Sequence, residues 1–583
     1  MSDTSLFQRL KERKLVQWAV AYLAGAWVVF EATGTALDAW NLSPLLVRSI
    51  HVLLIVGFFI TLVIAWYHGE KGRQRVSGPE LLMVAALLII AGVALTMLGR
   101  GQEAPQTVEA TAPAGSGDAR PSLAVLPMDN LSPDPQDAFF ARGVHTDITN
   151  ALGRISSLAL KGRYSVDQFP ERRPPIREIA SALNVDFLLG GTAQIVGTAV
   201  KVTVQLIDAR LDEQIWEGEW QAEYLPAEAI RIQSEIADSV ASELSIAIAP
   251  EEEARIAKIP TDDPVALKLV DRAEHLWSQR TESTVQEAIE LFDQAIERDP
   301  LYAEAYAGLA SAYLILADWG GGYGHEWERR EESFRQAQEM AERALEQDST
   351  LSLPHGVIAW VKIAVDWDWD GAEREFLAGL ERDPDQSQLH GWYSGFLAGM
   401  GRTDDALRQL AAVERLDPLS PWLANGPVVV YYLARQYNRA IEAGIEGITA
   451  YPDMISPYGW LCNSYLASGR IDEGMEACRE AAERDPRGGA RMAIILAHRG
   501  EREAALQELE EALANHGDRG SVNFDAAIVH AVLGNLDEAF PRLRRYITQY
   551  RSTAIWVPAE PIYDPFRADP RWEEILDYIG FGH

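Results

Sequence analysis

Residues 383–418, DPDQSQLHGWYSGFLAGMGRTDDALRQLAAVERLDP, decide most of the fold of this 583-residue chain. The segment begins and ends with Asp-Pro, and apolar residues recur at helical intervals on both sides of Gly401. A glycine between two amphipathic stretches favours a turn, because it adopts a left-handed backbone at little cost. The segment therefore predicts a pair of helices that ends at a proline.

The same pattern recurs through the second half of the chain. Pro384, Pro418, Pro452 and Pro486 follow one another at intervals of 34 residues, which is the period of the tetratricopeptide repeat. We therefore expect an all-helical array of about eight such repeats. The array is predicted at 264–550, with a connector before it at 249–263, a C-terminal capping segment at 551–583, and an insertion at 317–334 that is either a surface loop or part of a binding face.

Residues 122–248 have a different texture, in which short apolar runs alternate with amphipathic ones. Alternation at Val200, Val202, Val204 and Leu206 indicates a strand with one buried face. The region predicts a small α/β domain. Its expected strands lie at 122–127 and 158–166 and in the three phrases DFLLGGTAQIVG, AVKVTVQLIDAR and EQIWEGEWQAE, and its expected helices lie at 137–155, 175–183 and 226–248.

Three phrases of this domain carry a family resemblance: SLAVLPMDNLSPDPQDAFFARGVHTDI, DFLLGGTAQIVGTAVKVTVQLIDA and EQIWEGEW. In order and spacing they resemble the TolB-like domains that precede tetratricopeptide arrays in many bacterial proteins. Relatives usually have Gly-Ser, often followed by Arg, where this chain has Gly191-Thr192 followed by Ala193. The resemblance implies a bacterial protein in which this α/β domain is followed by a repeat array.

The N-terminal region carries three apolar stretches, at 15–37, 50–67 and 81–98, each about long enough to cross a bilayer. They predict a three-helix transmembrane anchor, and 99–121, rich in Ala, Pro and Gly, predicts a flexible linker. Lys and Arg flank the first stretch and fill the second loop, which favours a cytoplasmic N-terminus. We therefore expect a multi-pass protein of the bacterial inner membrane with periplasmic C-terminal domains; a cleaved signal peptide is the rival interpretation of the first stretch.

The composition of the chain limits the kinds of binding and catalytic site that it can form. The net charge of −34 opposes nucleic-acid binding, which relies on neutralising phosphates. Cys462 and Cys478 are the two cysteines, too few for a cysteine-built zinc site; either they are buried thiols or they form a disulfide. DWDWDG at 366–371 imitates the start of a calcium loop, but Leu377 stands where the twelfth-position Glu belongs. We predict no catalytic residues, no metal site and no cofactor.

These observations favour a non-enzymatic membrane-anchored scaffold that binds a protein or peptide partner in the groove of its array. Most positions where related arrays grip a terminal carboxylate are apolar or small here, so we expect recognition by shape and apolar contact. The candidate partner-binding residues are Trp422, Asn425, Tyr432 and Asn463. The alternative is a membrane sensor in which the TolB-like domain binds a ligand outside the cytoplasm.

Overall fold

The computed structural model describes residues 120–581 except 134–137, 170–173, 198, 224, 279–280, 324–326, 453, 485–489 and 518–519. The three predicted transmembrane stretches and most of the predicted linker lie outside the described residues. An α/β region and a helical array belong to one compact unit that begins at Ser116.

The α/β region is built on a mixed sheet. Its strands are β1 (Ser122–Val125), β2 (Asp129–Asn130), β3 (Ala159–Leu160), β4 (Phe187–Val196), β5 (Ala199–Asp208) and β6 (Glu213–Glu223). Their order is β3-β1-β4-β5-β6, and β2 pairs with β4. β1 is parallel to β3 and β4, whereas β4, β5 and β6 form an antiparallel meander.

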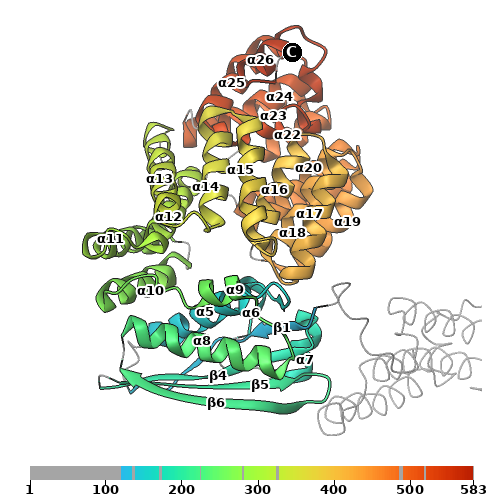
Figure 1. The fold of residues 1–583 in the computed structure, drawn as a ribbon. Coiled ribbons are helices and arrows are strands. Elements are labelled where there is room, and N and C mark those ends of the chain that lie inside the picture. The colour runs from blue at the N-terminus through green and yellow to red at the C-terminus, as the bar shows by residue number, and fades with distance from the viewer. Residues whose placement is uncertain are drawn as a thin grey trace, which may run out of the picture. The chain divides into compact units, whose positions relative to one another are not determined.

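Helices cover both faces of this sheet. The alternating apolar residues of β5 are buried, as predicted, and pack with α5 (Ala138–Gly153) and α8 (Pro226–Glu243). On the opposite face, α7 (Ile176–Leu183) packs against Leu188 of β4 and Ala124 of β1. α8 can be followed along the sheet in Figure 1. The predicted small α/β region is therefore present.

The predicted strand at 158–166 is wrong over most of its length. β3 covers Ala159 and Leu160 alone, and the chain then forms the short helix α6 (Arg163–Val166). The reason is a contact with the array, because Gly162 N donates to Leu416 O at 2.6 Å and Ser165 N donates to Asp417 Oδ1 at 2.7 Å. A continued strand would point these amides elsewhere.

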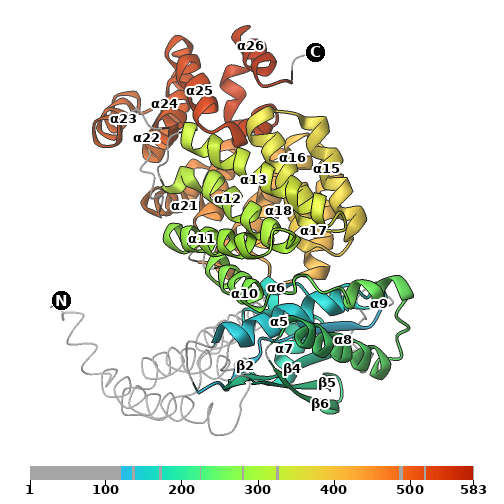
Figure 2. The same cartoon turned by 60° about the vertical axis from the view of Figure 1, so that its left-hand side comes forward.

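The array is a succession of helix pairs. After α9 (Pro250–Ile256), the pairs are α10 (Pro264–Ser278) with α11 (Glu282–Arg298), α12 (Ala303–Tyr323) with α13 (Trp327–Gln347), α14 (Leu353–Val361) with α15 (Trp369–Arg382), α16 (Ser387–Gly399) with α17 (Thr403–Leu416), α18 (Pro421–Leu433) with α19 (Tyr437–Ala450), α20 (Ile455–Ala467) with α21 (Ile471–Arg484), α22 (Arg491–His498) with α23 (Arg502–His516), and α24 (Gly520–Val532) with α25 (Leu536–Gln549). The pairs follow one another from green to red in Figures 1 and 2. The predicted helical solenoid is therefore confirmed.

The insertion predicted at 317–334 lengthens two helices in place of forming a long loop. α12 and α13 are each 21 residues long, and both reach into the inserted segment. Arg330 in this segment is buried and donates through Nε to Ala317 O at 2.7 Å, so it ties the end of α12 to α13. The inserted residues therefore extend the helix pair.

The predicted localisation needs correction. Among the residues that the structure describes, none of the helices combines the length and the apolar character needed to span a bilayer. This finding contradicts the predicted multi-pass location in the inner membrane, which is withdrawn.

Candidate functional site on the inner face of the array

The first helix of each pair lines the inner face of the array. First helices of successive pairs contact one another, as α12 does with α14, α16 with α18, and α18 with α20. Second helices make their main contacts with the first helices on either side of them. This arrangement follows from the repeat, because small residues such as Ala406 and Ala440 let the helices of a pair approach closely.

A C-terminal segment, residues 550–581, runs along this inner face. It contains two 3₁₀ turns, η3 (Arg551–Trp556) and η4 (Pro561–Phe566), and one helix, α26 (Arg571–Tyr578). η3 packs on α16, and η4 packs on α20 and α24. The predicted capping segment therefore covers several pairs of the array, including pairs far from the one that it follows in the chain.

Side chains of the array hold the backbone of this segment and of the residue before it. The indole Nε1 of Trp367 donates to Arg551 O at 3.1 Å, and Nε1 of Trp369 donates to Ile579 O at 3.2 Å. Arg330 Nη1 donates to Gln549 O at 2.8 Å. Such bonds satisfy carbonyls that an irregular chain cannot pair within itself. The inner face therefore binds a peptide of irregular conformation through hydrogen bonds to its main-chain carbonyls.

Aromatic and ionic contacts add to these bonds. Trp460 of α20 and Trp556 meet edge to face with ring centroids 5.6 Å apart, and Phe524 of α24 meets Tyr563 in the same way at 6.3 Å. Arg435 forms two hydrogen bonds of 2.6 Å with the Asp564 carboxylate. The forked geometry of this pair is the kind that selects a carboxylate over other acceptors.

The segment also carries an acid into the interior. The Glu560 side chain is buried, and burial raises its pKa to about 8, although Arg491 and Arg567 act in the opposite direction. Burial, followed by the charge of Glu560, raises the pKa of Tyr432 well above its usual value. A carboxyl group in such a position is costly to ionise.

Asp366–Gly371, which imitates a calcium loop in the sequence, forms part of this inner face. The π-helical turn η2 (Lys362–Asp366) ends at Trp367, whose φ of 53° is left-handed. Asp368 then caps α15 by accepting from Gly371 N at 2.9 Å, and it pairs with Lys362 at 3.1 Å. The unusual turn aims two tryptophans at the C-terminal segment, a role that the sequence analysis missed.

The four candidate partner-binding residues do not form one cluster. Tyr432 is fully buried and packs on Trp460 at 5.6 Å, and Asn463 is buried and accepts from Arg491 Nη1 at 3.0 Å. Asn425 is half-buried and accepts from Ser456 Oγ at 2.9 Å, and Trp422 packs beside Gly391. Two of the four therefore support the array, and Trp422 and Asn425 of α18 stay partly accessible.

Cys462 and Cys478 form a disulfide between α20 and α21. Of the two possibilities left by the sequence, the bridged one is realised. The bridge lies within one helix pair, the pair that also supplies Trp460. It therefore links the inner-face helix α20 to its outer partner.

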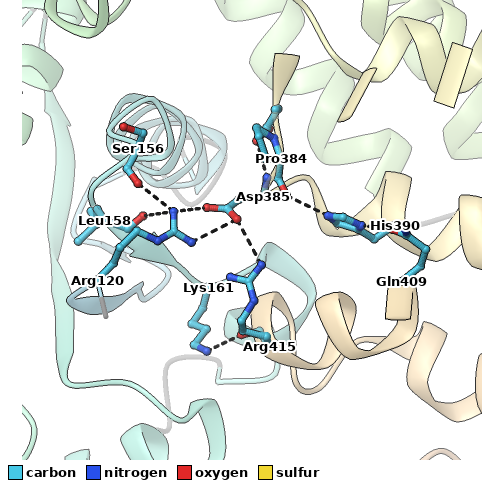
Figure 3. A network of polar contacts seen from close by, with 10 residues as sticks. Arg120, Ser156, Leu158, Lys161, Pro384, Asp385, His390, Gln409 and Arg415 are labelled. Atoms are coloured by element: carbon cyan, nitrogen blue, oxygen red, sulfur yellow. Dashed lines mark hydrogen bonds and ion pairs between the residues drawn. The ribbon is translucent and has the colours of Figure 1, made fainter. Parts of the chain in front are cut away.

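The α/β region docks on the edge of the array where second helices end (Figure 3). Arg120 donates to Asp385 at 2.7 Å and to Ser156 O at 2.9 Å, and Lys161 Nζ donates to Arg415 O at 2.6 Å. Deeper in the contact, Asp417 accepts from Ser165 and is fully buried. We call the contacts of Arg120, Lys161, Gly162 and Ser165 with residues 385–419 the domain junction.

Pockets in the described residues are modest. One of about 30 Å³, beside Asp147 between α5, α8 and β5, has room for about two waters. Burial raises the pKa of Asp147 to about 7, reinforced by Glu274. A second hollow of about 450 Å³ is an open depression lined by five side chains, those of Arg255, Ser349, Thr350, Glu381 and Arg382. Within the described ranges no group of three or more acidic, His or Cys side chains is arranged for a metal ion.

A model of the tetratricopeptide repeat family matches residues 278–319 and 490–552. The matched residues comprise α11 with most of α12 and the two pairs from α22 to α25, and these helices belong to tetratricopeptide repeats. A curated relative, the putative adenylate cyclase 3 of Rhizobium meliloti, is 26% identical over 251 residues. The match covers 43% of this chain and 41% of that relative, so the chain spans less than half of the relative's length. The TolB-like resemblance of residues 122–248 stays a prediction.

Solved structures, two of them described as tetratricopeptide repeat proteins, are similar at low identity. A repeat protein from Parabacteroides merdae is 12% identical, with 47% of this chain and 100% of that chain covered and a TM-score of 0.34. YrrB, described as having an unusual peptide-binding site, is 22% identical, with 33% and 89% covered and a TM-score of 0.23. PilF of Pseudomonas aeruginosa is 17% identical, with 45% and 97% covered and a TM-score of 0.27.

Proposed function

We propose that this protein is a non-enzymatic scaffold that binds a protein or peptide partner on the inner face of its tetratricopeptide array. The observation that carries the proposal is the C-terminal segment, because the inner face already holds an irregular peptide of its own chain. Trp367 and Trp369 bond its carbonyls, Trp460 packs on its aromatic side chain, and Arg435 pairs with its carboxylate. Tetratricopeptide arrays generally bind such ligands.

Trp422 and Asn425 are the proposed contacts of the partner at the margin of this face. Both are on α18, three positions apart and only partly buried. Asn425 offers an amide for hydrogen bonding, and Trp422 offers apolar area with a polar tip. Tyr432 and Asn463 would act behind them by holding α18 and α20 in place.

The adenylate cyclase name belongs to the relative. The matched 251 residues are a minority of both chains, and a match of this extent does not transfer an activity. Scaffolding agrees better with the tetratricopeptide fold, whose usual role is non-catalytic. The ligand-sensing alternative for the TolB-like region has less support, because the described pocket beside Asp147 has a volume of about 30 Å³.

Photocrosslinking in the source cells tests the proposal. A photoreactive phenylalanine replaces Asn425 in one variant and Ile445, which is exposed on the outer helix α19, in a matched control. Binding on the inner face predicts a discrete adduct, identified by mass spectrometry, from position 425 and none from position 445. Adducts of equal yield from both positions, or none from position 425, would refute it.

A further inference from the structure

The C-terminal segment binds far from its own position in the chain. It follows α25, the last helix of the array, yet its residues meet Val365, Trp367 and Trp369 across sequence separations of 186, 184 and 210. A segment that only capped the last pair would end on α24 and α25. This one also covers the inner surface of the middle pairs, where a partner would have to bind.

A peptide from another protein could make the same contacts with the array as the C-terminal segment does. Trp367, Trp369 and Arg330 all donate to main-chain carbonyls, which every peptide has. Selectivity comes from the edge-to-face contact of Trp460 with Trp556 and from the two hydrogen bonds of Arg435 to the Asp564 carboxylate. A competing ligand therefore needs an aromatic side chain and a carboxylate on a backbone that offers free carbonyls.

Docking of the segment also carries internal costs. Glu560 is 6% exposed, so its carboxyl group has lost nearly all of its hydration. Trp556 Nε1 is buried without a hydrogen-bond partner among the described residues. Asp564 and Arg435 are both near the surface, with 42% and 46% of their side chains exposed, so their pairing is weakened by water and salt. These costs offset part of what the segment gains by burying apolar side chains such as Tyr563 and Phe566 in the core of the array.

We propose that residues 550–581 are a releasable internal ligand that competes with the partner for the inner face of the array. Docked, the segment covers Trp367, Trp369 and Trp460; released, it exposes them to a peptide that carries aromatic and acidic side chains. The proposal rests on the proposed function and adds its regulation. Partner binding and release of the segment are then two halves of one equilibrium.

The test uses full-length protein and a fluorescent synthetic peptide with the sequence of residues 550–581. In one variant, Trp556→Ala and Asp564→Ala weaken the segment in the chain while leaving the array and the peptide unchanged. The expected result is that this variant binds the peptide at least about tenfold more tightly than the unaltered protein, by fluorescence anisotropy. Glu574→Ala, at an exposed position of α26, is the matched control and should leave the affinity unchanged.

A second measurement guards against local misfolding of the variant. Hydrogen exchange on the unaltered protein should show the amides of η3, η4 and α26 exchanging at least about tenfold faster than those of α16 and α18. Equal peptide affinity of variant and unaltered protein, or exchange of the segment at the rate of α16 and α18, would overturn the proposal. Either result leaves the Asn425 crosslinking experiment intact, so the failure of this regulation and the failure of the scaffold function can be told apart.

Discussion

The domain junction and the inner face are both contacts between distant parts of the chain, and they are built in opposite ways. At the junction, Asp417 is fully buried and accepts from the amide and hydroxyl of Ser165, so its polar groups are paired. On the inner face, large aromatic side chains surround an irregular segment that brings in the buried Glu560. The first contact is compact and mostly polar, whereas the second is broad and mostly aromatic around one buried acid.

The difference indicates what each contact is for. Small residues with complementary hydrogen bonds tolerate almost no change in shape, because a Cβ on Gly162 would lie 2.6 Å from Asp417 Cγ. Edge-to-face aromatic contacts and hydrogen bonds to main-chain carbonyls, by contrast, can be made by many different peptides. We therefore read the domain junction as a permanent attachment and the inner face as an exchangeable one.

The largest effect is expected from breaking the domain junction. Asp417→Ala leaves the buried amide and hydroxyl of Ser165 without their acceptor, which should cost roughly 3 kcal/mol. The α/β region should then detach from the array. We expect faster proteolysis of α6 and a lower midpoint of urea-induced unfolding. Asp404→Ala, at an exposed site on α17, is the control and should change neither. An unchanged midpoint for Asp417→Ala would mean that the junction is dispensable.

Removing the disulfide should have the next largest effect, and this change acts on the inner face because the bridge holds α20. The bridge closes a loop between residues 16 apart, and such a loop stabilises by about 3 kcal/mol at most. Replacing both Cys462 and Cys478 by Ala should lower the melting temperature and loosen the presentation of Trp460. The same shift should follow when the unaltered protein is reduced by a thiol reagent. If reduction has no effect on the unaltered protein, the two sulfurs are not bridged in solution.

The sequence predicted the repeating layers because their signals are local. Proline spacing and left-handed glycines such as Gly401, with φ of 73°, mark each pair without help from the rest of the chain. The β4 to β6 meander was predicted for the same reason, from alternation within each strand. Residues 158–166 were predicted wrongly because Gly162 and Ser165 donate to Leu416 and Asp417, some 250 positions away, and no local pattern encodes those contacts.

The candidate site was predictable only in part. Asn425 and Trp422 could be placed on an inner helix by counting repeats, but the period does not show that Tyr432 and Asn463 are buried. Trp367 and Trp369 looked like part of a calcium loop, and their aim at Arg551 and Ile579 depends on the π-helical turn before them. The irregular tail itself was the missed signal, because its four closely spaced prolines disfavour a regular helix and its many aromatic residues need a surface to cover.

The pH dependence of the protein should come partly from Glu560. Its pKa is raised to about 8 in the folded protein from an ordinary value of 4.5. A carboxyl group with a raised folded pKa favours folding fully below about 4.5 and loses this contribution as the pH rises toward 8. As the pH rises from 5 to 7, the free energy of unfolding of Glu560→Gln should therefore increase by roughly 2 kcal/mol relative to that of the unaltered protein. Urea titrations of both proteins at each pH measure this difference. If the unfolding free energies of the two proteins change with pH in the same way, the Glu560 carboxyl group is hydrated and the prediction is wrong.

The smallest expected effect separates the two contacts by their response to salt. Arg435 and Asp564 are nearly half exposed, so their pair should contribute less than about 1 kcal/mol and should weaken as salt rises from about 0.05 M to about 0.5 M. The buried contacts of Asp417 should respond little, because they involve a hydroxyl and an amide in place of an opposite charge.

Hydrogen exchange at both salt concentrations would compare η4 with α6 in one sample. Faster exchange of η4 alone at high salt is the predicted pattern, and Asp564→Asn should abolish that difference. Equal acceleration of α6 and η4 would mean that both contacts open together, and the distinction between a permanent and an exchangeable attachment would be lost.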